Sequence, residues 1–223
     1  MIFKNKYIVV LMILSFQLAS FNLFAAVKID VNRSGVKESI WMEEGKLHIE
    51  SGGGSTYTLI DSKQRQLHTV DNENKRISDL SGKVKQKLLL PAAEGISIEF
   101  VPHGAGPVML GFETELYLLK VNGEICNTEY LSKAAELTEI VAGMELLTEY
   151  KMASTFSSLP PELDLCFVAD HLSYERYTKF GFPIKSNDQF GKVQFELLSV
   201  DKNTKKPLGS FKLPENYSID SSQ

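Results

Sequence analysis

A β-hairpin that ends on a cysteine constrains this chain more than any other stretch of its sequence. The hairpin occupies residues 111–126, and Asn122 and Gly123 lie at its turn. A type I′ turn requires a positive φ angle at both central residues, and Asn and Gly tolerate that angle best. Because a two-residue turn fixes the register of the strands, Leu119 is predicted to pair with Cys126. The Cys126 thiol should therefore point into the apolar interior.

The N-terminus has the organisation of a secretory signal. Two lysines precede an apolar run over residues 7–18, and a mixed stretch ends in Ala25 and Ala26. This order of charged, apolar and small residues predicts a signal peptide over residues 1–26, cleaved after one of these two alanines. The alternative is an N-terminal anchor retained in the inner membrane, because the apolar run is almost long enough to span a bilayer. We expect a periplasmic protein that is not an integral membrane protein after cleavage.

The chain contains two cysteines, Cys126 and Cys166. Two cysteines in an exported chain imply one structural disulfide, because export places the protein in an oxidising compartment. A nucleophilic Cys166, with Asp170 and His171 as acid and base, is the alternative. Adjacent Asp and His side chains cannot both face Cys166, and export disfavours a free thiol. The disulfide is therefore the prediction.

Composition favours one domain with an ordinary hydrophobic core. The chain has 223 residues, of which 43% are hydrophobic. Without the two lysines of the predicted signal, 22 of the 24 basic residues remain against 28 acidic ones. No basic block indicates binding to nucleic acid. A single β-rich domain is expected over residues 27–217, followed by a flexible tail over residues 218–223.

Short strands separated by turn residues predict an antiparallel sheet. Segments of about five residues recur at roughly ten-residue spacing in the N-terminal half, which is typical of a meander. Asp61 and Asp71 begin two similar turns, because an Asp side chain can accept a bond from the backbone two residues further on. Besides the hairpin, the expected strands cover residues 39–42, 46–50, 56–60, 66–70, 75–80, 96–101, 192–200 and 208–213.

Two amphipathic helices are expected between the strands. Apolar side chains recur at helical spacing at Leu137, Ile140, Val141, Met144, Leu147 and Tyr150. This spacing predicts a helix over residues 132–156. A second helix is expected over residues 161–179, because Pro161 suits a first helical turn and Gly181 suits a helix end. The fold class is therefore α+β, a curved antiparallel sheet with a helical insertion at about 132–180 packed on its concave face.

No residue pattern predicts a catalytic or metal site. Glu113 and Glu115 fall on one face of a strand and could bind a cation or act as catalytic carboxylates. A strand end that emerges into solvent is the simpler explanation. The histidines lie scattered through the chain without the spacing of metal ligands, at positions His48, His68, His103 and His171. We therefore expect no enzyme activity, no metal and no cofactor.

An excess of apolar side chains is compatible with a cavity between the helices and the sheet. The first strand of the hairpin is apolar on both faces, as expected for a strand between two layers. A curved sheet with helices on one side can hold a hydrophobic ligand between them. A closely packed core without a ligand explains the same residues and stays open as the alternative. The candidate lining residues are Tyr117, Leu119, Val121, Ile140, Met144, Leu147, Phe167 and Tyr174.

Several motifs resemble the exported family called domain of unknown function 4412. The resemblance lies in the hairpin, which reads Gly111-Phe112-x-Thr114-x-x-Tyr117-x-Leu119-x-x-Asn122-Gly123-x-x-Cys126. It extends to the early strands, to Gly181-Phe182-Pro183 and to the closing Pro214-x-x-Tyr217. The resemblance implies a fold like the lipoprotein carriers LolA and LolB, an open half-barrel whose helices plug its concave side and whose cavity holds acyl chains. It supplies no catalytic residues, because the family has no established activity.

These features lead to two hypotheses about function. The first is an exported, non-enzymatic binding protein that holds a lipid, an acyl chain or another apolar ligand or partner. The second is a structural or protein-interaction module of the envelope whose own helices fill the cavity. Carriage of a ligand requires an open apolar space between the helices and the sheet.

Overall fold

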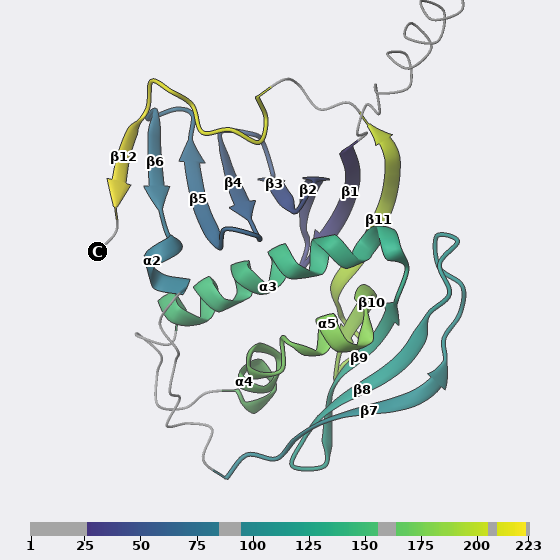
Figure 1. The fold of residues 1–223 in the computed structure, drawn as a ribbon. Coiled ribbons are helices and arrows are strands. Elements are labelled where there is room, and N and C mark those ends of the chain that lie inside the picture. Colours follow the sequence, from purple (N-terminus) through teal and green to yellow (C-terminus); the bar gives the residue numbers. More distant parts are fainter. Residues whose placement is uncertain (1–25, 85–94, 156–163, 205–208, 222–223) are drawn as a thin grey trace, which may run out of the picture.

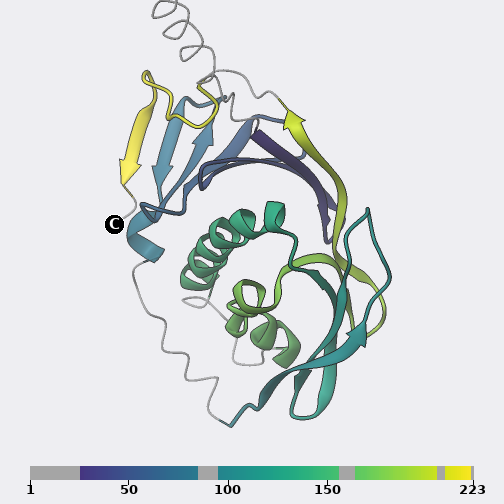
Figure 2. The same ribbon diagram turned by 45° about the vertical axis from the view of Figure 1, so that its right-hand side comes forward.

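The computed structural model describes residues 26–84, 95–155, 164–204 and 209–221 (Figure 1). These residues form one long, open and strongly curved sheet. The helices of residues 135–155 and 165–180 lie inside the curve, on its concave side (Figure 2). Nearly all of the predicted signal peptide lies outside the described residues, as does Pro161.

The sheet contains 12 strands among the described residues. Their order across the sheet is β12-β6-β5-β4-β3-β2-β1-β11-β10-β9-β8-β7. All neighbours pair antiparallel except β12 and β6, which are parallel. The strands are β1 (Ala26–Arg33), β2 (Val36–Glu43), β3 (Lys46–Ser51), β4 (Thr56–Asp61), β5 (Gln66–Asp71), β6 (Arg76–Asp79), β7 (Ile98–Ala105), β8 (Glu115–Val121), β9 (Glu124–Ser132), β10 (Phe182–Asp188), β11 (Val193–Thr204) and β12 (Ser218–Ser221).

The turns of the sheet follow the chemistry of their residues. Asn122 and Gly123 have φ angles of 51° and 87°, as the predicted two-residue turn requires. In the first of the two turns that begin with Asp, Asp61 Oδ1 accepts a hydrogen bond from the Gln64 amide at 2.9 Å. Asp71 Oδ1 accepts one from the Asn74 amide at 3.0 Å. Asp71 Oδ1 also accepts the predicted bond from the amide two residues on, that of Glu73, at 3.0 Å, whereas Asp61 bonds one residue further on than predicted.

A β-bulge changes the predicted register of the hairpin. The ladder shifts between Leu119 and Lys120, so that Leu119 pairs with Asn127 and not with Cys126. The predicted pairing is therefore wrong by one residue. A bulge places two residues of one strand opposite one residue of its partner. Cys126 is still buried, but every later residue of β9 changes face, and Glu129 turns into the interior.

Among the described residues, the helices are α2 (Ser81–Val84), α3 (Ala135–Thr155), α4 (Leu165–Leu172) and α5 (Arg176–Phe180). The second predicted helix is therefore two short helices, α4 and α5. At the end of α4, the Ser173 amide bonds to the Ala169 carbonyl, and the Ser173 hydroxyl bonds to the same carbonyl at 2.6 Å. A side chain that bonds back to the helix in this way competes with the continuing backbone ladder.

The long helix α3 packs across the concave face of the sheet. Leu137, Ile140 and Val141 of α3 join one core cluster with residues of β1, β2, β3, β10 and β11. The close approach depends on Gly143, because a Cβ atom there would lie 2.5 Å from Leu47 Cδ1 of β3. The apolar face predicted for this helix is therefore the face that forms the core.

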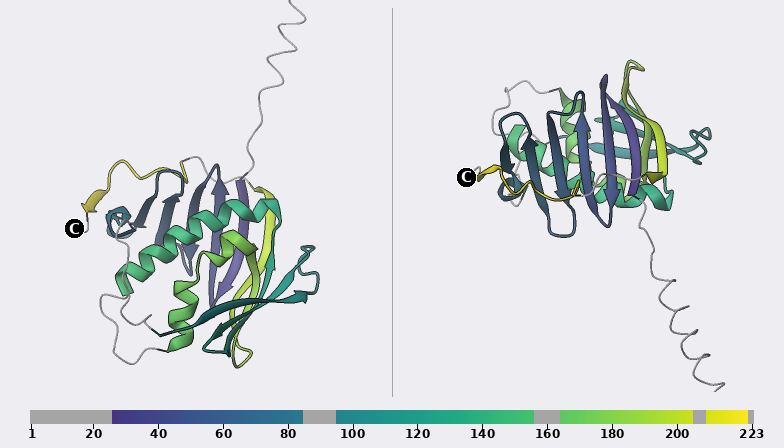
Figure 3. Two further views of the ribbon diagram at one scale, coloured as in Figure 1. Left: turned by 60° about the horizontal axis from the view of Figure 1, so that its bottom comes forward. Right: turned by 90° about the horizontal axis from the view of Figure 1, so that it is seen from above.

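The C-terminal segment covers the opposite, convex face of β4, β5 and β6 (Figure 3). Leu213 and Tyr217 pack there against Leu59, Val70 and Ile77. Residues 209–213 form turns and irregular chain, so the strand predicted over 208–213 is wrong for these residues, and residue 208 lies outside the described residues.

The flexible tail predicted over residues 218–223 is wrong for residues 218–221, because Ser218–Ser221 form β12 on the edge of the sheet; residues 222 and 223 lie outside the described residues. The Ser218 amide bonds to the Lys75 carbonyl at 3.0 Å. The backbone of an edge strand can accept a further strand whatever its side chains are. The sequence pattern of the tail therefore carried no sign of this pairing.

Replacing Gly181 with alanine should lower the free energy of unfolding by about 3 kcal/mol or more. Gly181 has φ +117° and ψ 173°, a region that is essentially restricted to glycine. An added Cβ atom would also collide with the Ser132 carbonyl oxygen, which belongs to the backbone of β9. Urea denaturation measures the change. The matched control is Gly53→Ala, because Gly53 has φ +128° but open space around it. Equal losses in the two variants would contradict a steric role for Gly181.

Candidate functional site

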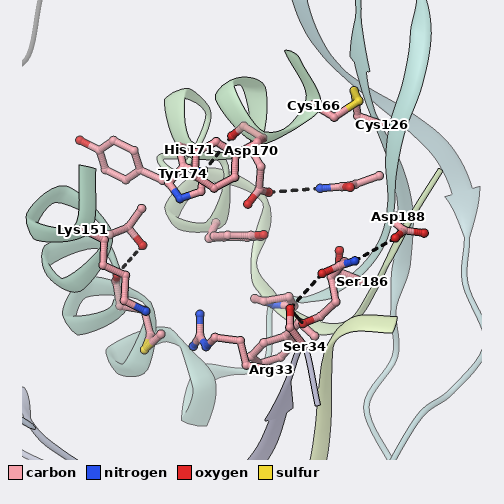
Figure 4. A pocket seen from close by; sticks show the side chains of 18 of the residues that line it. Arg33, Ser34, Cys126, Lys151, Cys166, Asp170, His171, Tyr174, Ser186 and Asp188 are labelled. Atoms are coloured by element: carbon pink, nitrogen blue, oxygen red, sulfur yellow. Dashed lines mark hydrogen bonds between the residues drawn. A yellow bond between two sulfur atoms is a disulfide. The ribbon is translucent and has the colours of Figure 1, made fainter. Parts of the chain in front are cut away.

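A pocket of about 440 Å³ lies between the helices α3 and α4 and the concave face of the sheet (Figure 4). Its sheet side is formed by β9, β10, β11 and the end of β1. The volume falls within the range of about 300–1,000 Å³ that is typical of small-molecule sites. An open space therefore exists between these two helices and the sheet.

One wall of the pocket is apolar. Val141 and Met144 contribute to it from α3, and Tyr174 from the segment after α4. Phe182 of β10 and Phe195 of β11 face them, with their rings 5.7 Å apart in an edge-to-face arrangement. Aromatic and aliphatic side chains of this kind suit the tail of an amphipathic ligand.

Three of the eight predicted lining residues line this pocket, namely Met144, Phe167 and Tyr174. Phe167 is 38% exposed and lies at the solvent side. Ile140 is buried in the main core, and Leu147 packs against that core. Ile140 and Leu147 therefore do not line this pocket.

The three predicted lining residues of β8 do not reach the pocket either. Leu119 and Val121 are buried in a second cluster, where they meet Ala169 of α4. The Tyr117 ring stacks on Phe100 at 4.8 Å. These side chains lie beneath α4 and α5, so the helices themselves occupy the space in which a ligand was predicted.

A disulfide joins Cys126 of β9 to Cys166 of α4, with the two Cα atoms 5.2 Å apart. The predicted bond is confirmed. Asp164 caps α4 and accepts a bond from the Cys166 amide at 2.9 Å, which sets the start of the helix beside the strand. Both sulfur atoms are bonded, so Cys166 has no thiolate to act as a nucleophile. The disulfide lines one end of the pocket and ties α4 over the sheet.

A buried ion pair, absent from the sequence-based predictions, fixes the other helix to the sheet. Arg176 of α5 donates to Glu129 of β9 through Nε at 3.1 Å and through Nη2 at 2.7 Å. The two side chains are 3% and 0% exposed. Arg176 also donates to the carbonyl oxygens of Asp170 and Ser173, at 2.9 Å and 3.0 Å. The guanidinium is therefore surrounded by acceptors.

The electrostatics of this pair follow from burial and charge. Burial raises the pKa of the Glu129 carboxyl, and the Arg176 charge and hydrogen bonds oppose that rise. Burial alone would lower the pKa of Arg176, but Tyr177, Glu129 and Asp170 raise it well above its ordinary value. The Asp170 carboxylate pairs with Arg176 and also accepts a bond from Asn127 at 3.2 Å. The network therefore joins α4, α5 and β9.

The two glutamates considered as a cation or catalytic site have a simpler environment. Glu115 accepts a hydrogen bond from the Tyr117 hydroxyl at 2.6 Å and pairs with Lys133 at 3.4 Å. The Tyr117 bond is the main cause that lowers the pKa of Glu115. Glu113 is exposed in the loop before β8. Among the described residues, no group of three or more His, Cys, Asp and Glu side chains could hold a metal ion.

None of the helices within the described part of the chain is both long enough and apolar enough to cross a membrane. Comparison with known proteins gives no family, because no family model and no curated protein matches the chain. Among solved structures, the chain is similar to an uncharacterized conserved protein from Thermus thermophilus. That similarity has a TM-score of 0.45 and 10% sequence identity, and it covers 92% of this chain and 96% of the other.

A second similarity is to MucB, with a TM-score of 0.33 and 10% identity over 92% of this chain and 63% of MucB. Both scores are low, so neither structure contributes to the interpretation of the site. That interpretation depends on the geometry of the pocket alone.

Proposed function

We propose that this protein is an exported, non-enzymatic carrier that holds an acyl chain or a similar apolar ligand between α3, α4 and the curved sheet. The observation that carries the proposal is the pocket of about 440 Å³ with its aromatic and aliphatic wall. A module whose helices filled the concave face completely would have no such space. The open volume is therefore the reason to prefer a carrier over a purely structural module.

The proposal also includes the family, the half-barrel fold and the cellular location of the protein. The hairpin motif, the early strands and the closing Pro214-x-x-Tyr217 support membership of the family called domain of unknown function 4412. The open curved sheet with helices on its concave side is in keeping with a half-barrel like that of LolA and LolB. The N-terminal charged and apolar segment and the disulfide support a periplasmic location.

Filling the pocket from α3 should abolish the binding of a neutral apolar probe. Thr148 is half-buried, lines the pocket and donates its hydroxyl to its own helix at the Met144 carbonyl. Thr148→Trp places an indole ring in the space that the ligand needs. We expect the affinity for the fluorescent probe N-phenyl-1-naphthylamine, measured by titration, to fall by about tenfold or more.

The matched control is Thr138→Trp on the same helix. Thr138 is exposed, donates its hydroxyl to the Ala134 carbonyl and does not line the pocket. This variant should bind the probe as the unaltered protein does. If the unaltered protein failed to bind the probe, or if Thr148→Trp bound it unchanged, the proposed function would be wrong.

A further inference from the structure

Two basic side chains meet at one end of the pocket. Arg33 is the last residue of β1, and Lys151 belongs to α3 on the opposite wall. Figure 4 shows the two side chains extending toward each other, at the end of the pocket away from the Cys126–Cys166 disulfide. Arg33 is 30% exposed and Lys151 is exposed, so this end of the pocket communicates with solvent.

Arg33 makes few hydrogen bonds within the protein for a guanidinium group. A guanidinium has five N–H donors. The Nε atom donates to Glu38 at a long 3.3 Å. The Nη2 atom is buried and has no hydrogen-bond partner among the described residues. A buried donor without a partner is costly and is unusual in a folded protein.

Lys151 adds a second positive charge to this end of the pocket. Partial burial of its ammonium group, followed by the Arg33 charge, lowers the pKa of Lys151. The Glu38 carboxylate acts in the opposite direction and raises that pKa. Lys151 is therefore close enough to Arg33 for the two cations to repel each other. An additional anion at this place would be attracted by both of them.

The acidic residues of the pocket are engaged elsewhere. Asp164 caps α4, and Asp170 pairs with Arg176. Asp188 accepts bonds from the turn between β10 and β11, including the Lys192 amide at 2.9 Å. Glu145 accepts a bond from the Thr178 hydroxyl of α5. None of these contacts involves Arg33.

We propose that Arg33 and Lys151 bind the anionic head group of a single-chain amphiphile, a fatty acid carboxylate, whose chain lies along the apolar wall of the pocket. The guanidinium of Arg33 lies over the Phe195 ring, with its Cζ atom 5.5 Å from the ring centroid, so the cationic and apolar surfaces are continuous. Guanidinium groups match carboxylates geometrically and bind them strongly. This inference rests on the proposed function and adds the chemical class of the ligand.

The test compares dodecanoate with the neutral 1-dodecanol as competitors of N-phenyl-1-naphthylamine, using the whole protein. Arg33→Gln and Lys151→Gln should each weaken dodecanoate binding by about tenfold and leave dodecanol binding unchanged. The matched control is Lys185→Gln, because Lys185 is also 30% exposed and also holds a carboxylate, Glu196, at 3.3 Å. This control should bind dodecanoate normally.

A third variant distinguishes the loss of a head-group contact from misfolding. Glu38→Gln removes the carboxylate that competes for Arg33, so it should strengthen dodecanoate binding by about threefold. A gain of affinity cannot arise from partial unfolding. Acetate and inorganic phosphate should not displace the probe, because a small anion lacks the chain.

The possible results separate the two proposals. If dodecanol and dodecanoate bind equally in all variants, the carrier proposal stands and the head-group inference is overturned. If acetate or phosphate competes as well as dodecanoate, the site binds small anions and the inference is likewise wrong. If neither probe nor competitor binds the unaltered protein, the proposed function itself fails.

Discussion

Replacing Arg176 with methionine should destabilise the protein by about 3–5 kcal/mol, the usual cost of leaving a buried charge without its partner. Glu129 is 0% exposed and receives two hydrogen bonds from Arg176. Methionine keeps much of the side-chain volume but donates nothing. The free energy of unfolding from urea denaturation measures the loss. The control is Lys179→Met, an exposed cation on the same helix, which should change stability by less than about 0.5 kcal/mol.

The stability lost in Arg176→Met should vary with pH, and the direction of that variation identifies the unpaired Glu129 carboxylate as the cause. Without Arg176, burial raises the pKa of Glu129 further above its value in the unfolded chain. A carboxyl whose pKa is higher in the folded state than in the unfolded state stabilises the fold when the pH lies below the unfolded-state pKa. This contribution to stability is lost as the pH rises through the folded-state pKa. The deficit of Arg176→Met should therefore be largest at neutral pH and shrink as the pH falls toward about 5.

The double variant Glu129→Leu, Arg176→Met distinguishes a lost charge partner from lost packing. Removing both charges leaves no buried unpaired ion, because Asp170, the other ionic partner of Arg176, is 42% exposed and keeps its bond from Asn127, so much of the stability should return. A double variant as unstable as Arg176→Met, with a deficit independent of pH, would contradict the ion-pair explanation.

Removing the disulfide should cost about 4 kcal/mol in the chain-entropy model, since the bond closes a loop over a sequence separation of 40. The double variant Cys126→Ala, Cys166→Ala tests this by urea denaturation without reductant. The bond ties α4 to β9 at one end of the pocket, so we also expect the variant to bind N-phenyl-1-naphthylamine more weakly.

Reduction of the unaltered protein provides the control for the cysteine variant. Dithiothreitol should lower the stability of the unaltered protein to that of the double variant and should not affect the variant. If the unaltered protein contained two thiols that react with iodoacetamide after unfolding without reductant, the disulfide would be absent and the expected loss would not occur.

Much of the sheet could be predicted because its signals are local. The Asn122-Gly123 turn and the Asp61 and Asp71 turns depend on residues adjacent in sequence, and each is present as predicted. The pairing of Cys126 with Cys166 was the only choice within the chain. Strand alternation also predicted β2 to β5 closely, because one face of each is buried in the core.

The ion pair between Glu129 and Arg176 was not predicted because one extra residue in β9 shifts the register of the hairpin. In the uninterrupted register, Glu129 would point away from the interior face that carries Tyr117 and Leu119. The bulge in β9 reverses this, and Glu129 comes opposite Tyr117. A bulge leaves no clear mark in one sequence, since its cost and benefit depend on the partner strand and on the helices above it. Arg176 consequently had no visible partner.

The basic end of the pocket was missed for a different reason. Arg33 is brought to Phe195 by the pairing of β1 with β11, two strands far apart in the chain. Lys151 lies opposite Arg33 across the pocket (Figure 4) because α3 crosses the concave face of the sheet (Figure 2). Long-range placement of this kind depends on tertiary packing. The predicted lining residues were apolar ones, and most of them serve the core.

The most direct test of the central claim, that the space between α3, α4 and the sheet holds an acyl ligand, is native mass spectrometry. The protein should be purified without detergent from the cells that export it, beside its Thr148→Trp and Thr138→Trp variants. We predict that the unaltered protein and Thr138→Trp retain an added mass equal to that of a fatty acid, removable by organic solvent, and that Thr148→Trp does not. An unaltered protein with only the mass of its polypeptide, or a Thr148→Trp variant that retains the same added mass, would contradict the account.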